Sequence, residues 1–384
     1  MVAGQPYPQF AMFAVMSSAF PQNGYFPPDY RSGRAAFRDA AEGAGAMLLT
    51  YPAGSTGPDG EPVFTDVALL GPADAPHVLL CNSATHGVEG FCGSGVFTGW
   101  LASGEAAHLP PGMRVVLIHA LNCHGFAWLR RTTEENVDLN RNFVDHAQGH
   151  PKNDEYSKLH PVVLPDNWTE QDVKDTTEKL EAYARDTSAY RLQSVLTGGQ
   201  YDHPDGIFFG GREPTGAHRR FLEILEAHVV GAKHVLFLDW HTGLGPYGAG
   251  ELIGMTRPGS AHGDRVSAWF SNGLSTPSEG QAVSAPLTGT IGSGLRRRMS
   301  GTDTEVTSLT VEFGTYSVRE VLMALIADNW LHTKGDPRSE QGREIKRQVR
   351  KALYPDEDDW KELVWVRGRQ ILRRAVRGLG TLTA

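Results

Sequence analysis

The chain is poor in cysteine and has no long apolar run. Its 384 residues include only three cysteines, Cys81, Cys92 and Cys123, at irregular spacing. That number and spacing exclude a disulfide framework and a cysteine-based zinc site. No apolar stretch approaches the roughly 20 residues that a membrane-spanning helix needs. Residues 1–20 contain no Lys or Arg and so do not resemble a secretory signal. We therefore predict a cytoplasmic protein with no membrane partner.

Positive charge is also in short supply. The chain has 36 Lys and Arg residues against 44 Asp and Glu residues, a net charge of -8. This balance argues against a general nucleic-acid binder. The share of hydrophobic residues, 40%, and of charged residues, 21%, is ordinary for a globular enzyme. We expect small molecules or peptides as partners, and the composition leaves the oligomeric state open.

Short apolar runs predict the buried strands of a sheet. The runs are residues 78–81, 115–118, 235–238 and 309–311, each next to polar residues. Continuous apolar runs of this length are typical of strands buried on both faces. Helix-like segments alternate with them, at residues 95–103, 216–229 and 317–331. The alternation predicts an α/β fold, a three-layer α/β/α sandwich with a central mixed, mostly parallel sheet.

The length allows two domains, but α/β enzymes of this size often fold around one sheet. We predict a single catalytic domain over residues 1–334, followed by a charged helical extension over residues 335–384. Within the first, residues 146–211 form a long polar insertion. Such insertions are commonly lids or substrate loops, and a surface elaboration is the alternative. Apolar residues recur on one helical face in residues 360–376, which predicts a surface or interface helix.

Polar side chains follow each of the predicted strands. In chain order they are His86 and Glu89, then Asn122, then Asp239 and His241, and finally Glu312. Open α/β sheets bind ligands at the carboxyl ends of their strands. Four separate segments are therefore expected to meet at one site.

A ligand set for a metal can be assembled from this group. His86 and Glu89 are three residues apart in a turn that opens a helix, so both project to the same side. A single His-x-x-Glu motif is expected by chance in a chain of this composition. For His241, the alternative is an ordinary hydrogen-bonded histidine without a metal. Together, two imidazoles and one carboxylate leave a position open for water, which suits a catalytic zinc site.

Other residues have two interpretations each. Glu312 interrupts a buried apolar run, where a carboxylate is costly unless it is ion-paired or catalytic. Arg141 next to Asn140 offers a guanidinium fork and an amide suited to a carboxylate, or a purely structural contact. Asp138 is either a turn residue or a support for a ligand imidazole.

The order of these motifs resembles the zinc carboxypeptidase superfamily (carboxypeptidase A-like), including its aspartoacylase and succinylglutamate desuccinylase branch. The residues that carry the resemblance are His86-x-x-Glu89, Asn122-x-x-Gly125, Arg131 nine residues before Asn140-Arg141, His241 and Glu312. They span roughly residues 29–331. The sequence looks most like an uncharacterised bacterial branch with Thr-His-Gly-Val-Glu-Gly, Val-Asp-Leu-Asn-Arg-Asn-Phe and Trp-His-Thr-Gly-Leu-Gly.

The resemblance implies one zinc ion per chain and a role for each matched residue. His86, Glu89 and His241 would bind zinc, and Glu312 would be the general base. Arg131 would stabilise the oxyanion, with the adjacent Arg130 as the alternative. Asn140 and Arg141 would receive the substrate carboxylate, and Asp138 would support His86.

Two departures from the family pattern are visible. Asn122-Cys123 stands where the family usually has Asn-Pro. The tyrosine that clamps substrate in true carboxypeptidases has no clear counterpart, and the candidates are Tyr201, Tyr247 and Tyr316. This second departure weakens a peptidase assignment more than a hydrolase assignment.

The function expected is a zinc-dependent hydrolase, metallocarboxypeptidase-like, that cleaves an amide bond next to a free carboxylate. An N-acyl-amino-acid deacylase is the alternative, and a non-catalytic carboxylate-binding pseudoenzyme is a third possibility. The polar insertion at residues 146–211 would narrow the entrance, which slightly favours small substrates or short peptides.

Overall fold

The computed structural model describes residues 24–254, 259–271, 273–276 and 287–382. Residues 1–20, whose lack of Lys and Arg supported the predicted cytoplasmic location, lie outside that part of the chain. Within the part that is described, no helix has both the length and the apolar character needed to cross a membrane.

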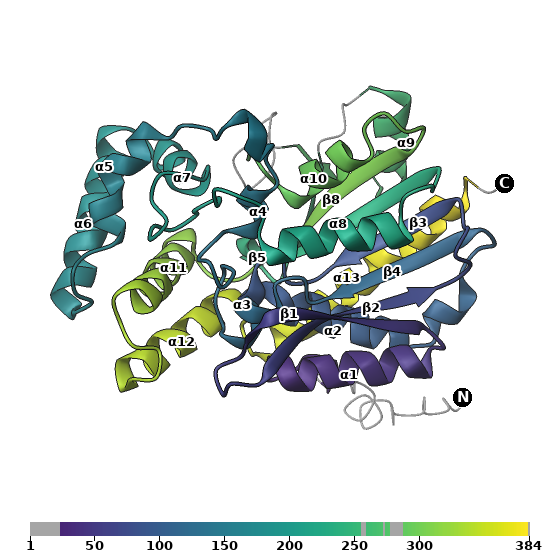
Figure 1. Ribbon diagram of the computed structural model, residues 1–384, viewed down its shortest axis with the longest axis horizontal. Helices are drawn as coiled ribbons and strands as arrows, with labels where there is room; N and C mark the ends of the chain where they lie inside the picture. The colour runs from purple at the N-terminus through teal and green to yellow at the C-terminus, as the bar shows by residue number, and fades with distance from the viewer. Residues whose placement is uncertain (1–23, 255–258, 272, 277–286, 383–384) are drawn as a thin grey trace, which may run out of the picture.

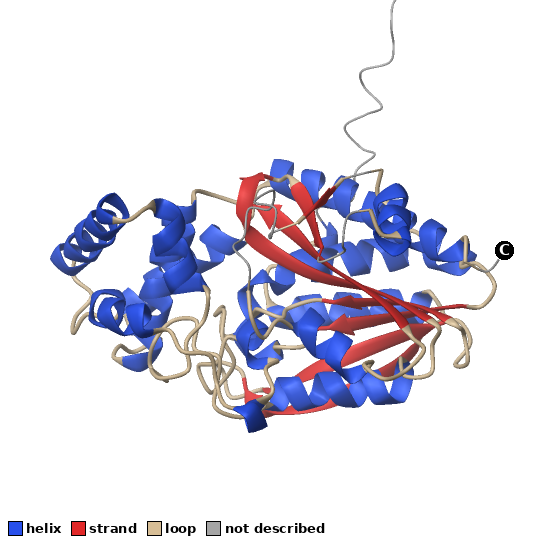
Figure 2. Cartoon of the chain, turned by 90° about the horizontal axis from the view of Figure 1, so that it is seen from above, coloured by secondary structure: helices blue, strands red, loops and turns tan. Residues whose placement is uncertain are grey.

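A mixed sheet forms the centre of the fold (Figures 1 and 2). Among the described residues it has eight strands in the order β1-β2-β4-β3-β5-β8-β6-β7. The strands are β1 (Met47–Thr56), β2 (Pro62–Leu70), β3 (His77–Asn82), β4 (Met113–His119), β5 (His234–Tyr247), β6 (Gly250–Gly254), β7 (Leu274–Ser275) and β8 (Glu305–Gly314). The neighbours β4, β3, β5 and β8 run parallel, whereas β1 with β2, β2 with β4, and β6 with β8 are antiparallel.

Both faces of this sheet are covered, because successive side chains of its central strands point to opposite sides. On β3, Leu79 and Cys81 belong to one apolar cluster, and Val78 and Leu80 to another. The first cluster is covered by α1 (Tyr30–Gly43), α2 (Gly90–Ala102) and α13 (Asp358–Gly380), and the second by α8 (Gly216–His228) and α10 (Ile291–Arg298). The predicted three-layer α/β/α sandwich is confirmed.

The apolar runs identified in the sequence correspond to β3, β4, β5 and β8. The outer strands β1, β2, β6 and β7 are not among these runs. The edge strand β1 shows why, because its residues alternate between exposed and partly buried positions and so form no continuous apolar run.

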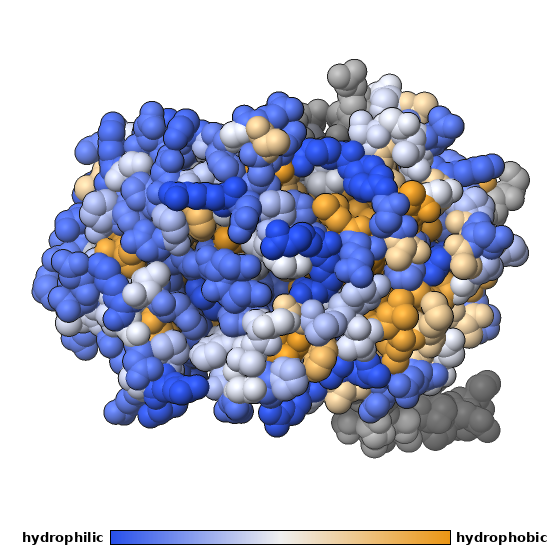
Figure 3. Space-filling model, in the orientation of Figure 1, coloured by the Kyte–Doolittle hydropathy of each residue, from blue (hydrophilic) through white to orange (hydrophobic). Residues whose placement is uncertain are grey.

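The insertion at residues 146–211 is a helical lobe beyond one end of the sheet, at the left of Figure 1. It contains α5 (Asp154–Val163), α6 (Glu170–Asp186) and α7 (Ala189–Thr197). A capping box between Thr169 and Asp172 opens α6. On the face shown in Figure 3, hydrophilic side chains cover most of this lobe.

The C-terminal segment contributes to the same core as the sheet. It follows α11 (Val318–Thr333) and contains α12 (Glu340–Leu353) and α13. Trp360, Val364, Ile371 and Leu372 of α13 are fully buried. The indole Nε1 of Trp360 donates to the carbonyl of Gly314 at the end of β8, at 2.9 Å. The residues set apart from sequence as 335–384 thus pack directly on the strands that lead to the candidate site.

Candidate metal centre

His86 and Glu89 lie in the connection between β3 and α2. Glu89 ends a short 3-10 helix (Gly87–Glu89) that leads directly into α2. The chain comes so close to a neighbouring segment here that a Cβ on Gly87 would lie 2.0 Å from the backbone of Gly125. Only glycine fits such an approach. The amide of Gly87 also donates to the carbonyl of Arg131, at 3.2 Å, so the turn is fixed against the segment that carries this arginine.

His241 and Glu312 are brought together by the pairing of β5 with β8. The two residues are directly opposite each other in this parallel register. Their side chains therefore leave the sheet on the same face, next to one another. The amide of Thr242 donates to Oε2 of Glu89 at 3.2 Å, which joins β5 to the carboxylate of this predicted ligand.

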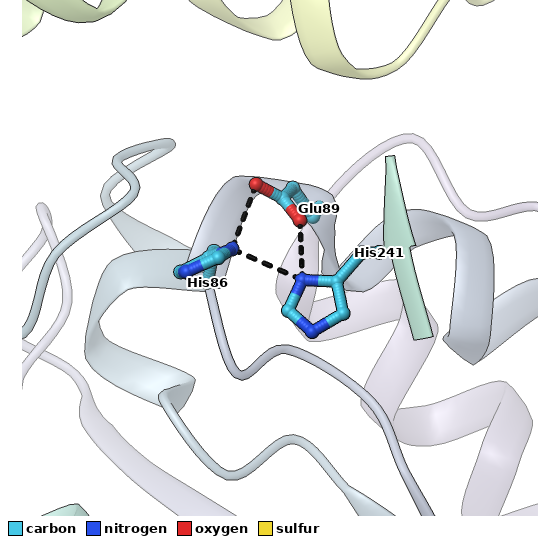
Figure 4. A group of neighbouring side chains, drawn as sticks. All are labelled: His86, Glu89 and His241. Carbon is cyan, nitrogen blue, oxygen red and sulfur yellow. Dashed lines mark hydrogen bonds and ion pairs between the residues drawn. The ribbon is translucent and has the colours of Figure 1, made fainter. Parts of the chain in front are cut away.

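The three predicted ligands form one compact group (Figure 4). Nδ1 of His86 lies 2.9 Å from Oε1 of Glu89, and Nδ1 of His241 lies 3.0 Å from Oε2 of the same carboxylate. The two Nδ1 atoms are 3.1 Å apart. All three side chains are buried.

The outer nitrogen of each imidazole contacts a different carboxylate. Nε2 of His86 lies 3.1 Å from Oδ1 of Asp138, and Nε2 of His241 lies 2.6 Å from Oδ2 of Asp239. In a neutral imidazole, an Nε2–H group that donates to a carboxylate leaves the Nδ1 lone pair directed at the shared centre. Carboxylate–histidine pairs of this kind orient metal ligands and increase their basicity.

The charges around this group favour a cation at its centre. Although burial alone raises the pKa of a carboxyl group, His86, His241 and Arg131 lower the pKa of Glu89 below its usual value. Burial likewise opposes the ionised form of Asp138, but Arg131, Arg141 and His86 hold its pKa well below the usual range. For His241, burial lowers the pKa, and the stronger combined effect of Asp239 and Glu89 raises it well above the usual value. The site therefore stabilises ionised carboxylates and positive charge between them.

These donor atoms fit zinc. Zinc binds imidazole nitrogen and carboxylate oxygen at about 2.0–2.2 Å in tetrahedral sites, which places neighbouring ligand atoms roughly 3.3 Å apart. The separations of 2.9, 3.0 and 3.1 Å between the three donor atoms are close to that value. Two nitrogens and one oxygen leave a fourth position open, as in catalytic zinc sites.

Glu312 is buried beside the three ligands. Burial raises the pKa of its carboxyl group, and the nearby Glu89 adds to this effect, whereas His241 opposes it. The result is a pKa of about 7. The amide of Leu244 donates to Oε1 of Glu312 at 2.9 Å and so orients the carboxyl group. A carboxyl group with a pKa near neutrality is suited to general acid–base chemistry.

The side chains of the adjacent residues Arg130 and Arg131 contact different residues. Arg131 contacts Oδ2 of Asp138 through Nε at 3.0 Å and Oε1 of Glu89 through Nη1 at 2.9 Å. Arg130 instead donates to Asn136 at 2.7 Å, and its Nε is 3.8 Å from Asp328. Of the two, Arg131 lines the cavity described below and Arg130 does not. Position therefore favours Arg131 for a contact with substrate.

Asn140 and Arg141 line the same cavity and are also bound to the protein. Arg141 donates through Nε and Nη2 to the carbonyl of Thr197, at 2.9 and 2.6 Å, and through Nη1 to the carbonyl of Asn140. Oδ1 of Asn140 accepts from the amide of Ile291 at 2.9 Å. Arg141 thus connects the metal region to the end of α7 in the insertion.

The three candidate tyrosines lie away from the cavity wall. Tyr201 is buried and donates to the carbonyl of Arg141 at 2.6 Å. Tyr247 donates to Asp359 at 3.0 Å, and Tyr316 lies beside Tyr247. Among the described residues that line the cavity, none is a tyrosine.

A cavity of about 470 Å³ opens over the three predicted metal ligands. The polar end of its wall contains the predicted site residues His86, Glu89, Arg131, Asn140, Arg141, His241 and Glu312. Asp138 lies behind this wall, where it contacts His86 and Arg131. The structure therefore brings all eight predicted residues together, seven on the wall and one behind it.

Sequence analysis named Asp239 among the residues expected at the site but assigned it no role. Its Oδ1 accepts from Asn82 at 3.0 Å and from Thr85 at 2.6 Å, and its Oδ2 contacts His241. Its position two residues before His241 on a strand was a signal, because residues with this spacing share a face. The cross-strand contacts that hold it have no local signature in the sequence.

The chain was also compared with known proteins. A family model described as "Protein of unknown function (DUF2817)" matches residues 26–367. The chain belongs to this family. No curated protein matches it.

Solved structures similar to this member of the family include carboxypeptidases and a desuccinylase. Bovine thrombin-activatable fibrinolysis inhibitor, solved with tick carboxypeptidase inhibitor, has 11% identity and a TM-score of 0.44, with 92% of this chain and 99% of that chain covered. A metallo-carboxypeptidase from Pseudomonas aeruginosa has 15% identity and a TM-score of 0.41, with 90% of this chain and 71% of that chain covered. The succinylglutamate desuccinylase from Chromobacterium violaceum has 13% identity and a TM-score of 0.33, with 83% of this chain and 74% of that chain covered.

Proposed function

We propose that this chain is a zinc-dependent hydrolase that cleaves an amide bond next to a free carboxylate. One observation carries the proposal. His86 and His241 each direct Nδ1 toward Glu89 while Nε2 contacts a separate buried carboxylate. This arrangement places two imidazoles and one carboxylate around one point, where a metal ion would replace the proton that the raised pKa of His241 retains. The carboxyl group of Glu312 is buried beside them.

Glu312 is the general base in this proposal. Zinc, when bound at His86, Glu89 and His241, supplies Lewis-acid polarisation of the scissile carbonyl and acidifies water. The Oε1 atom of Glu312 is held by the amide of Leu244. We assign the proton of the attacking water to the other oxygen, Oε2. Glu312 then delivers this proton to the leaving amine.

Arg131 and Arg141 have separate tasks. Arg131 lies against Glu89 and stabilises the negative charge that develops on the carbonyl oxygen. The hydrogen bonds of Arg141 to Thr197 and Asn140 use three of its five N–H groups, and Nη1 also lies 3.9 Å from Oδ1 of Asp138. In this proposal the substrate carboxylate accepts from the remaining N–H groups. The buried, anchored guanidinium is then a rigid receptor, and Asn140 adds an amide beside it.

The same residues would serve a metallocarboxypeptidase or an N-acyl-amino-acid deacylase, because both substrates carry a carboxylate next to the scissile amide. The described cavity wall has no tyrosine that would clamp a peptide. This observation favours the deacylase as the second candidate. A pseudoenzyme is disfavoured, because a binder would not need Glu312.

The test is a hydrolysis screen of the zinc-loaded chain. The substrates are N-acyl amino acids and short peptides, each in a free-acid and a carboxamide form, and released amino acid is measured. We expect turnover of the free acids only. Equal turnover of the carboxamides would refute the role of Asn140 and Arg141, and no turnover of any amide would refute the hydrolase.

A further inference from the structure

The wall of the cavity above the predicted metal ligands is largely apolar, with Thr177, Gln193 and Arg296 among its other polar residues. Away from the metal, much of its wall comes from apolar side chains of the insertion and of α11. The insertion contributes Leu180 and Ala184 from α6 and Leu192 and Leu196 from α7. Helix α11 faces them with Val321, Leu322 and Leu325. The insertion that looked polar in sequence therefore has an apolar inner side and a hydrophilic outer side.

Contacts between α6 and α11 close this apolar part of the cavity. Thr177 Oγ1 lies 3.9 Å from Sδ of Met323, and Arg319 Nη1 lies 2.8 Å from Oε1 of Glu181. The side chains of this ion pair are 66% and 46% exposed, so the pair lies at the rim. Its two charges neutralise each other and face solvent, and they leave the interior between the leucines apolar.

We propose that this part of the cavity is a binding site for the long apolar acyl chain of an N-acyl amino acid. The inference rests on the proposed function, because it places the scissile amide at the metal group and the amino-acid carboxylate at Arg141. A small acetyl group would leave water against Leu180, Leu192 and Leu196. An extended hydrocarbon chain would displace that water, which is the favourable exchange that drives apolar binding.

The first measurement is the dependence of hydrolysis on chain length. N-acetyl, N-butanoyl, N-octanoyl and N-dodecanoyl forms of one amino acid are compared at saturating zinc. Each buried methylene should lower KM about fourfold, which corresponds to about 0.8 kcal/mol. The trend should level off when the cavity is filled. A KM that does not depend on chain length would overturn the proposal.

A cavity-filling substitution tests the location. Ala184 is half-buried and lines the cavity, so Ala184→Trp should obstruct the apolar part without removing any core side chain. Ala182→Trp is the matched control, because Ala182 is two positions away on the same helix, equally half-buried and absent from the cavity wall. Ala184→Trp should raise KM for the dodecanoyl substrate at least tenfold and leave the acetyl substrate unchanged. Ala182→Trp should change neither, and equal effects of both variants would overturn the location.

Binding to a variant that cannot turn over substrate separates this proposal from the proposed function. Calorimetry with zinc-loaded Glu312→Gln chain and the same four ligands gives the Kd directly. Tighter binding with increasing chain length, together with no hydrolysis by the unsubstituted chain, would refute the hydrolase and retain the acyl-chain site. Hydrolysis without any dependence of Kd or KM on chain length would refute the acyl-chain site and retain the hydrolase.

Discussion

Nε2 of His241 lies 2.6 Å from Oδ2 of Asp239, two residues earlier on the same strand. Asp239 in turn accepts hydrogen bonds from Asn82, at the end of β3, and from Thr85 in the turn before His86. The orientation of one proposed ligand is therefore coupled to the segment that carries the other two. A single buried carboxylate links both halves of the site.

Asp239→Asn should weaken zinc binding. The amide cannot accept the Nε2–H of His241 with the strength of a carboxylate, so we expect about a 10- to 100-fold higher Kd for zinc. Competition with a chelator of known affinity measures this. Asp66→Asn is the control, because Asp66 is also a buried carboxylate but pairs with Arg34 and Arg38 on the outer part of the sheet. It should reduce stability and leave zinc affinity unchanged, whereas an unchanged Kd in Asp239→Asn would refute the assigned role.

Glu312→Gln should retain zinc and lose turnover. The carboxamide keeps the shape of the side chain but cannot take a proton, and general-base catalysis is worth about 10²–10⁴-fold. Because Glu312 is not among the three ligands, the metal content should stay at one ion per chain. Steady-state kinetics and metal analysis on the same sample check both statements. Full activity of this variant would contradict the assignment of the base.

Activity should have an acid limb governed by Glu312. Burial raises the pKa of this carboxyl group to about 7 in the metal-free chain. The base works as a carboxylate, so activity is present above the pKa and is lost as the pH falls through it. A bound cation stabilises the carboxylate and lowers this pKa, which places the limb at or below about pH 7. A profile of kcat/KM against pH, with zinc saturation verified at each point, tests this, and a limb lying well above that pH would argue against Glu312.

Arg131 and Arg130 should differ sharply when each is replaced by lysine. Arg131→Lys loses the fork that contacts both Asp138 and Glu89, and we expect kcat to fall by about 10²–10³-fold, the usual loss for one oxyanion donor. Arg130→Lys disturbs the contacts with Asn136 and Asp328 and should lower the melting temperature with little change in kcat. The reverse pattern would transfer the oxyanion role to Arg130.

Much of the fold was predictable because its central strands carry local signals. The runs that became β3, β4, β5 and β8 are short and largely apolar, and predicted site residues follow them. The edge strand β1 lacks this signal, since its residues alternate between exposed and partly buried positions. The helical periodicity of the C-terminal segment was visible, but the surface that it covers depends on contacts with distant strands.

The site was predictable where short motifs carry it and unpredictable where distant segments meet. His86 and Glu89 are in one turn, and their spacing is visible in the sequence. The support of Asp239 comes from Asn82 and Thr85, 157 and 154 residues away. The apolar cavity wall arises in the same manner, because α6, α7 and α11 hide their leucines only when they are packed together.

The most direct test of the central claim is the zinc content of the purified chain after equilibration with zinc and removal of the excess. The account predicts one zinc ion per chain, and loss of that ion in a folded His241→Ala variant. Binding of no zinc by the unsubstituted chain, or retention of one ion by the His241→Ala variant, would contradict a metal centre built from His86, Glu89 and His241.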